Sequence, residues 1–128
     1  MILYRATIGI PPVSKKNSQR IVFNQKRGVH FIKPSVAYER YERDALRLLH
    51  PLDHPISAPV NVKCVFYMAT RRRVDLTNLL EAADDVLVKR GILLDDHSGI
   101  IVSHDGSRVL YDRERPRTEI EIEEVEIR

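Results

Sequence analysis

The residues of this chain that could do chemistry are concentrated between positions 71 and 96. A run of arginines stands ahead of a series of carboxylates that ends in an acidic pair. The arginines are Arg71, Arg72 and Arg73, and the carboxylates are Asp75, Glu81, Asp84, Asp85, Asp95 and Asp96. Clustered carboxylates repel one another unless a cation lies between them, and arginines attract polyanions. Ligands for a hard cation beside a phosphate-binding edge predict metal-assisted chemistry on nucleic acid.

Several of these carboxylates fall on one predicted helix, from about Leu76 to Arg90. Its apolar stripe recurs at helical spacing and consists of Leu79, Leu80, Ala83, Val86 and Leu87. Asn78, Glu81 and Asp85 share the opposite face. Like charges four residues apart cost an isolated helix roughly 0.2–0.5 kcal/mol. A bound cation or a neighbouring arginine would remove that repulsion.

Each acidic position also has a purely structural explanation. Asp75 has the residue type of a helix N-cap, and Asn78 with Glu81 has the spacing of a capping box. Asp85 could be a solvated surface charge. The pair at 95–96 follows a helix end, where a turn is equally expected. The residues alone leave these alternatives open.

The distribution of charge indicates an anionic partner. The net charge is only +3, yet residues 1–38 contain no Asp or Glu. The cations of this segment are Arg5, Lys15, Lys16, Arg20, Lys26, Arg27 and Lys33. A segment with charges of one sign is a typical nucleic-acid footprint, although a solvated basic surface would look the same.

Other classes of protein have little support. The chain has no glycine-rich phosphate loop, its histidines form no metal-binding pattern, and Cys64 is its only cysteine. No apolar run approaches the roughly 20 residues that span a bilayer, and the N-terminus has no signal-peptide pattern. We therefore expect a cytoplasmic protein with no membrane contact and no small-molecule cofactor.

The pattern of elements predicts one α+β domain over residues 1–128. Alternation predicts strands at 2–10, 59–68, 100–104 and 118–124, a hairpin of 20–23 with 30–33, and helices at 35–50 and 76–90. The segment 105–115 is expected to be a charged loop or a loose hairpin. This order predicts two helices packed on a mixed, largely antiparallel sheet.

Taken together, these motifs resemble the RusA family of Holliday-junction resolvases, which is found in bacteria and their prophages. The resemblance covers most of the chain. It rests on Pro11-Pro12 with Lys15, Lys16, Asn17 and Ser18, then on the arginine run with Asp75, Asn78, Asp85, Gly91, Asp95 and Asp96. It implies a homodimeric α+β endonuclease that uses Mg²⁺, with Mn²⁺ as an alternative ion, to cut four-way DNA junctions symmetrically.

The resemblance also implies roles for individual residues. Asp75 and Asp96 match catalytic aspartates, whereas Thr77 stands where many members have another aspartate and Glu81 where many have a lysine. The expected catalytic residues are Asp75, Asp96 and Glu81, and the expected metal ligands are Asp75, Asp96, Asp95 and Asp85. The expected DNA-binding residues are Lys15, Lys16, Asn17, Lys26, Arg27, Lys33, Arg71, Arg72 and Arg73.

Two further expectations follow from the departures and from helix geometry. The alternative function is a non-catalytic or weakly catalytic binder of branched DNA, which Thr77 and Glu81 favour. A third possibility is a nuclease that acts on other branched DNA. The predicted helix is roughly 22 Å long, and the six residues after it span at most about 20 Å. An antiparallel pairing of this helix in a homodimer would bring Asp75 beside the partner's Asp96 without strain.

Overall fold

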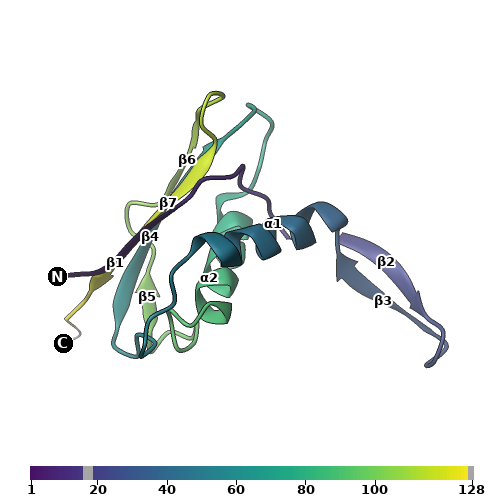
Figure 1. The fold of residues 1–128 in the computed structure, drawn as a ribbon, viewed down its shortest axis with the longest axis horizontal. Coiled ribbons are helices and arrows are strands. Elements are labelled where there is room, and N and C mark those ends of the chain that lie inside the picture. The colour runs from purple at the N-terminus through teal and green to yellow at the C-terminus, as the bar shows by residue number, and fades with distance from the viewer. Residues whose placement is uncertain (16–18, 127–128) are drawn as a thin grey trace.

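A mixed sheet and two helices form the body of the molecule, and a two-stranded hairpin extends away from them (Figure 1). The structure, a computed structural model, describes residues 1–15 and 19–126. In chain order the elements are β1 (Ile2–Ile8), β2 (Gln19–Asn24), β3 (Val29–Pro34), α1 (Val36–Leu48), β4 (Val60–Met68), α2 (Leu76–Lys89), β5 (Ile101–Ser103), β6 (Arg108–Tyr111) and β7 (Arg117–Glu124).

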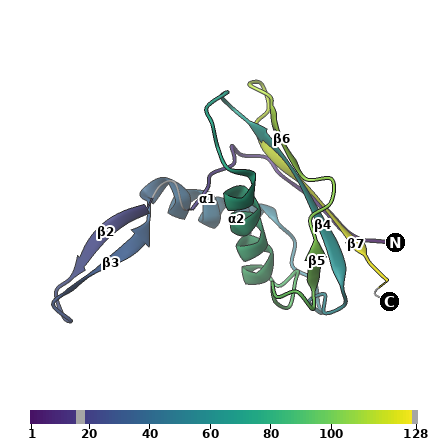
Figure 2. The ribbon, with the colours of Figure 1, turned by 180° about the vertical axis from the view of Figure 1, so that it is seen from behind.

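The body sheet has the order β1-β7-β4-β5, with β6 also pairing with β4. β7 runs antiparallel to both β1 and β4, whereas β5 and β6 run parallel to β4. Both helices lie on one face of this sheet, as the view from behind also shows (Figure 2). The predicted α+β class, with a mixed and largely antiparallel sheet, is confirmed.

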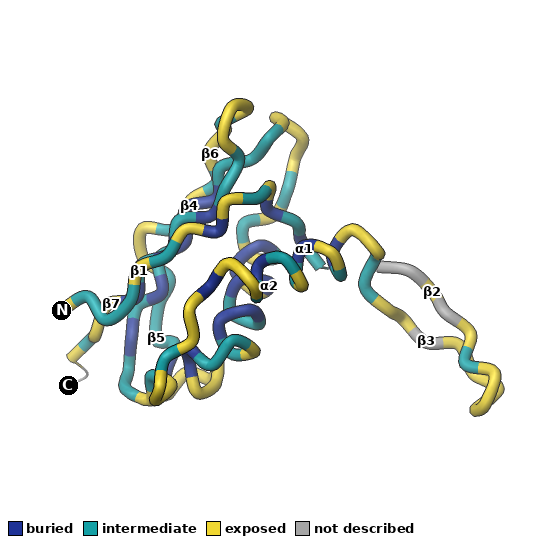
Figure 3. Tube along the Cα trace, in the orientation of Figure 1, coloured by how far each residue is buried: buried dark blue, intermediate teal, exposed yellow. Residues whose placement is uncertain are grey.

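The core lies between the helices and the inner face of the sheet, where the buried part of the trace is concentrated (Figure 3). Alternate residues of β4 supply it, because successive side chains of a strand point to opposite faces. Val60, Val62, Cys64 and Phe66 are all at most 1% exposed. Ile120 on β7 is paired with Cys64, so the two strands present their apolar residues to the same side.

Both helices follow the predicted pattern. The Ser35 hydroxyl caps α1 by accepting a hydrogen bond from the Tyr38 backbone N–H at 3.1 Å. The whole predicted stripe of α2 is buried: Leu79, Leu80, Ala83, Val86 and Leu87. The helix ends at Lys89, and Gly91 follows with φ of 78°, a conformation that glycine adopts without steric cost.

One expectation was wrong. Part of the predicted loop at 105–115 is the strand β6, which pairs in parallel with Val65–Met68 of β4. Its local sequence is short and flanked by charges, so alternation gave no signal. The strand forms because β4 continues past the end of β5 and offers unpaired backbone groups there, which is a non-local cause.

The predicted hairpin is confirmed as β2 and β3, with Gly28 at φ of 64° in its turn. It continues directly into α1 and stands clear of the sheet in both ribbon views. Among the described residues, no helix is long and apolar enough to cross a membrane.

Candidate nucleic-acid interface and acidic site

The arginine run forms an exposed rim after the end of β4. All three guanidinium-bearing residues are exposed, and the Arg71 guanidinium carbon lies 4.3 Å from the centre of the Tyr111 ring at the end of β6. Arg72 and Arg73 line a hollow of about 320 Å³. The rim therefore offers one cation held on an aromatic ring and two beside an open surface, a combination suited to phosphate groups.

Asp75 lies directly after this rim, at the N-cap position of α2. Its side chain makes no capping hydrogen bond, and instead Oδ2 accepts a hydrogen bond from the Asn78 side-chain amide at 3.3 Å. The capping explanation therefore accounts for its backbone position but not for its carboxylate. The capping-box explanation for Asn78 and Glu81 is wrong, because the helix begins at Leu76 and Asn78 lies inside its first turn.

Asp95 and Asp96 lie on an exposed segment after the helix. Asp95 Oδ1 accepts the Asp96 backbone N–H at 2.7 Å, and this bond lowers the pKa of Asp95, so its carboxyl group stays ionised. That contact joins adjacent residues and closes no turn, and the chain has no turn at 95–96, so the turn explanation for Asp95 is not supported. The charge of Asp96 contributes to raising the pKa of Asp84 in α2, so the chain brings Asp96 back towards the helix.

Two residues that were predicted to have different roles form an ion pair, which the sequence did not indicate. Lys15, expected to bind DNA, lies 3.5 Å from Asp85, expected to bind metal, and both side chains are about one-third exposed or less. The pair neutralises both charges, although such pairs contribute at most about 1 kcal/mol. Lys33 similarly lies 3.5 Å from Glu39 of α1.

The other predicted DNA-binding residues that the structure describes belong to the hairpin. Lys26 and Arg27 are exposed at the turn of the hairpin. Lys16 and Asn17 lie outside the described residues. The predicted basic surface is therefore divided between this hairpin and the arginine rim on the body.

The metal site stays a prediction. Among residues 1–15 and 19–126, no three His, Cys, Asp or Glu side chains are grouped closely enough to hold an ion. The donor chemistry still fits Mg²⁺, because Asp75, Asp95 and Asp96 present exposed carboxylate oxygens. Mg²⁺ is usually held by one or two carboxylates together with water and substrate phosphates, rather than by a complete protein cage.

Sequence reasoning also missed a half-buried contact between Asp84 of α2 and His104. His104 Nε2 lies 3.0 Å from Asp84 Oδ2, and its Nδ1 lies 2.8 Å from the Val62 carbonyl oxygen. Because a carbonyl only accepts, Nδ1 donates there, and a proton must also lie between Nε2 and the carboxyl group. Burial raises the pKa of Asp84, and its hydrogen bond raises the pKa of His104. Twenty positions separate the two residues, and no spacing pattern links them.

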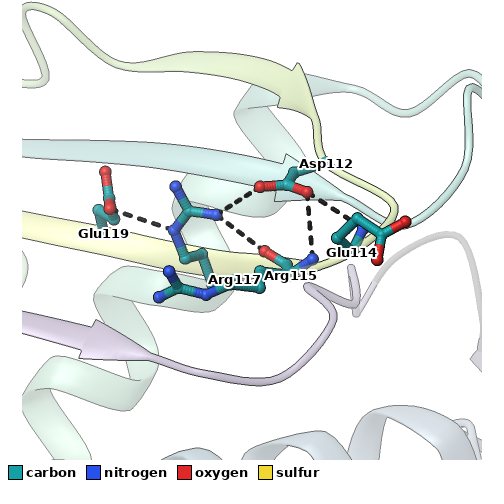
Figure 4. A network of polar contacts seen from close by, with 5 residues as sticks. All are labelled: Asp112, Glu114, Arg115, Arg117 and Glu119. Atoms are coloured by element: carbon teal, nitrogen blue, oxygen red, sulfur yellow. Dashed lines mark hydrogen bonds and ion pairs between the residues drawn. The ribbon is translucent and has the colours of Figure 1, made fainter.

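A second polar network closes the turn between β6 and β7 (Figure 4). Arg117 donates to Asp112 at 2.8 Å and to Glu119 at 3.1 Å, and its guanidinium lies 3.8 Å from the Tyr67 ring centre. Asp112 also accepts the Glu114 and Arg115 backbone N–H groups, and its pKa is lowered mainly by Arg117. Arg117 is thus used inside the fold, unlike the arginines of the rim.

The sequence of this chain is similar to those of known proteins. A family model described as Endodeoxyribonuclease RusA matches residues 10–123. The chain belongs to the RusA family. Proteins named crossover junction endodeoxyribonuclease RusA are similar to it: the one from Shigella sonnei (strain Ss046) is 33% identical, and those from Escherichia coli (strain K12) and Enterobacteria phage 82 are 32% identical. Each match covers 75% of this chain and 76% of the relative.

The two departures from the RusA pattern lie on the exposed side of α2. Thr77 is in its first turn and Glu81 is one turn further, and both are exposed. The resemblance implies that other members have an aspartate at position 77 and a lysine at position 81, so these two exposed positions are where a difference in charge is expected.

The Asp84–His104 pair gives a prediction for stability against pH. The pKa of His104 is raised above 6.5, so the folded state holds its proton more tightly than the unfolded state. This stabilisation is complete below about pH 6.5 and is lost as pH rises through the folded pKa. The raised pKa of Asp84 has the same sign at lower pH. We expect the Tm advantage of the wild type over His104→Gln to shrink as the pH rises above about 6.5.

Thermal unfolding followed by circular dichroism at a series of pH values measures this difference. His54→Gln is the matched control, because His54 is exposed in the loop between α1 and β4. A Tm difference for His104→Gln that stays constant across the series would contradict the assignment.

Proposed function

We propose that this chain is a Mg²⁺-dependent endodeoxyribonuclease that resolves four-way DNA junctions as a homodimer in the cytoplasm. The observation that carries the proposal is the position of Asp75. Its exposed carboxylate is not used in a capping bond, and it directly follows three exposed arginines at the start of α2. A ligand for a hard cation and a phosphate-binding rim are thus adjacent. The names of the relatives support DNA junctions as the substrate.

In this proposal, different residues of the chain bind the phosphates, orient a carboxylate and hold the ion. The rim arginines hold the phosphates that flank the scissile bond, and the N-terminal end of α2 adds a favourable dipole for a phosphate placed there. Asn78 orients the Asp75 carboxylate through its amide hydrogen bond. Asp75 and Asp96 would hold the ion, with Asp95 beside them. When bound, Mg²⁺ polarises the scissile phosphate and lowers the pKa of water at the site.

The homodimer is part of the proposal because a symmetric junction requires two cuts related by a two-fold axis. Each copy would supply one rim and one acidic surface. Lys26 and Arg27 at the hairpin turn would bind phosphates of the junction arms, away from the cleavage site.

The second candidate is a branched-DNA binder with little or no cleavage. Two observations favour it: Thr77 and Glu81 depart from the family pattern, and no group of three candidate ligands occurs among the described residues. A labelled four-way junction and a matched linear duplex, each incubated with Mg²⁺ and with EDTA, separate the two functions. Binding without Mg²⁺-dependent cleavage would establish the second candidate.

Asp75 and Asp96 are the two aspartates proposed to hold the ion, and substitution of either one tests this. Asp75→Asn and Asp96→Asn should each abolish junction cleavage, because each removes a charged oxygen ligand of the ion. Junction affinity should be unchanged or higher, because one negative charge facing DNA is lost. Single-turnover cleavage and gel-shift titrations measure the two effects. Asp53→Asn, an exposed aspartate in the loop after α1, should retain full activity. A near-normal rate for either site variant refutes the assignment.

Glu81→Gln tests whether the departure at this position is functional. We expect a cleavage rate lower by about tenfold or more, which corresponds to about 1.4 kcal/mol of transition-state stabilisation. The change keeps the side-chain length and the helix propensity. If the rate is unchanged, Glu81 is a surface residue of α2 and leaves the catalytic set.

The basic hairpin turn is tested by the dependence of affinity on salt. Lys26→Ala with Arg27→Ala should weaken junction binding and reduce the slope of log affinity against log salt by about 1.8, or about 0.9 for each lost phosphate contact. Arg47→Ala, an exposed residue in the last turn of α1, is the control. A slope that stays at the wild-type value would mean that the hairpin turn faces away from DNA.

A further inference from the structure

The hairpin of β2 and β3, residues 19–34, is called the arm below, and it exposes an unusual amount of apolar side chain. Ile21 is 74% exposed, Ile32 is 67% exposed, and Phe23 and Val29 are each 50% exposed. Scattered exposed apolar residues are ordinary, but a contiguous group of large ones marks an interaction surface. All four of these residues lie on the two strands of this one hairpin.

The strand register places most of them on one face. Ile21 is paired with Ile32, and Phe23 is paired with His30. Paired residues point to the same side, and residues two apart along a strand do so as well. Ile21, Phe23, His30 and Ile32 therefore form one surface, called the apolar arm face. The Phe23 and His30 rings lie 4.9 Å apart, so the surface is continuous across the strands.

Little of the chain's own body lies against this face. The arm leaves the start of α1 and extends away from the sheet in two opposite views (Figures 1 and 2), and most of the part of its trace that Figure 3 describes is exposed. A two-stranded hairpin without further packing is at best marginally stable in water. A well-formed arm therefore requires a partner that covers its apolar face.

The distribution of charge argues for a protein partner on this face rather than DNA. The apolar arm face has no Lys, Arg, Asp or Glu, whereas the cations Lys26 and Arg27 lie at the turn and Lys33 near the base. A surface that binds DNA needs cations directed at phosphates. A surface made mainly of isoleucine and aromatic side chains suits a contact with another protein, while the turn stays available for DNA.

A second copy of this chain is the partner that fits most directly. In a two-fold dimer each copy presents the same surface, so the surface must be complementary to itself. The apolar arm face meets this condition, because packing it on its own copy buries no carboxylate, lysine or arginine group. An antiparallel crossing packs the two isoleucines on the partner's aromatic pair and places the two basic turns at opposite ends. Face-to-face packing of strands at about 10 Å is the ordinary spacing of such layers.

We propose that the arm is the surface through which two copies of this chain associate, with the apolar arm face of one packed on the same face of the other. The inference deepens the homodimer of the proposed function and rests on it. An antiparallel pairing of α2 stays untested, but no large exposed apolar residue of the described chain lies on α2. Such a pairing would bring exposed Thr77 and Glu81 together without an apolar contact.

The size of the arm indicates how far the contact extends. Six residues per strand give a length of roughly 20 Å, and two strands give a width of roughly 10 Å. Two such faces bury well under the roughly 1,200–2,000 Å² of a stable interface. An interface of stable size would therefore need surface beyond the arm, and Val36 at the start of α1, 45% exposed next to the base of the arm, is available for it.

The experiment measures the oligomeric state of the full chain by sedimentation equilibrium. Ile21→Glu with Ile32→Glu should raise the dimer dissociation constant by about 100-fold or more, because uncompensated carboxylates would be buried. Leu48→Glu with Leu110→Glu is the matched control, since both leucines are exposed outside the arm, and it should stay as dimeric as the wild type. Ile21→Thr with Ile32→Thr keeps strand propensity and should weaken the dimer less; it serves if the glutamates prevent folding.

The outcomes are distinct. A wild-type dimer that dissociates with both arm variants, while circular dichroism keeps the wild-type spectrum, supports the inference. A monomeric wild type, or arm variants as dimeric as the wild type, overturns it. Arm variants that stay dimeric but lose junction affinity would assign the face to DNA instead. Cleavage is scored separately: a wild-type dimer with the expected arm effects and no cleavage refutes the proposed function but leaves the arm contact standing.

Discussion

Strand β4 is the element on which the rest of the structure depends. It pairs with β7 on one side and with both β5 and β6 on the other, and its inward side chains supply the centre of the core. The arginine rim and Asp75 follow directly from its end. The pairing of β4 with its neighbouring strands fixes the direction in which β4 runs. The arginine rim at the end of β4 therefore has a defined position relative to α2. The charged surface is thus built on a strand whose inner face carries no charge.

The fold separates the acidic residues into two groups. Asp84 and Asp85, in the third turn of α2, each have a partner from a distant part of the chain, His104 and Lys15 respectively. Asp75, Asp95 and Asp96 lie outside and are exposed. Pairing the inner carboxylates limits the total negative charge at the helix, so the outer ones can face an anionic substrate with less repulsion.

Local patterns predicted the parts of the fold that local forces determine. The apolar stripe from Leu79 to Leu87 and the helix end before Gly91 could be predicted from the sequence. Hydrophobic periodicity and backbone preference are properties of the segment itself. The strand β6 and the contacts of Asp84 and Asp85 could not be predicted, because their partners are remote in sequence and are chosen by tertiary packing. For the site, residue types indicated Asp75 and the rim, whereas the distances among the carboxylates depend on how the chain returns after α2.

The contact between Arg71 and Tyr111 has a consequence for the cost of binding. A free arginine side chain carries about 2 kcal/mol of rotamer entropy, which is lost in part when it is fixed on a ligand. Arg71 already rests on an aromatic ring, so part of this loss occurs on folding. Arg72 and Arg73 keep their freedom until a ligand arrives. The rim therefore combines one ordered arginine with two mobile ones. Arg71 can hold one phosphate in a fixed position, while Arg72 and Arg73 adjust to the positions of neighbouring phosphates.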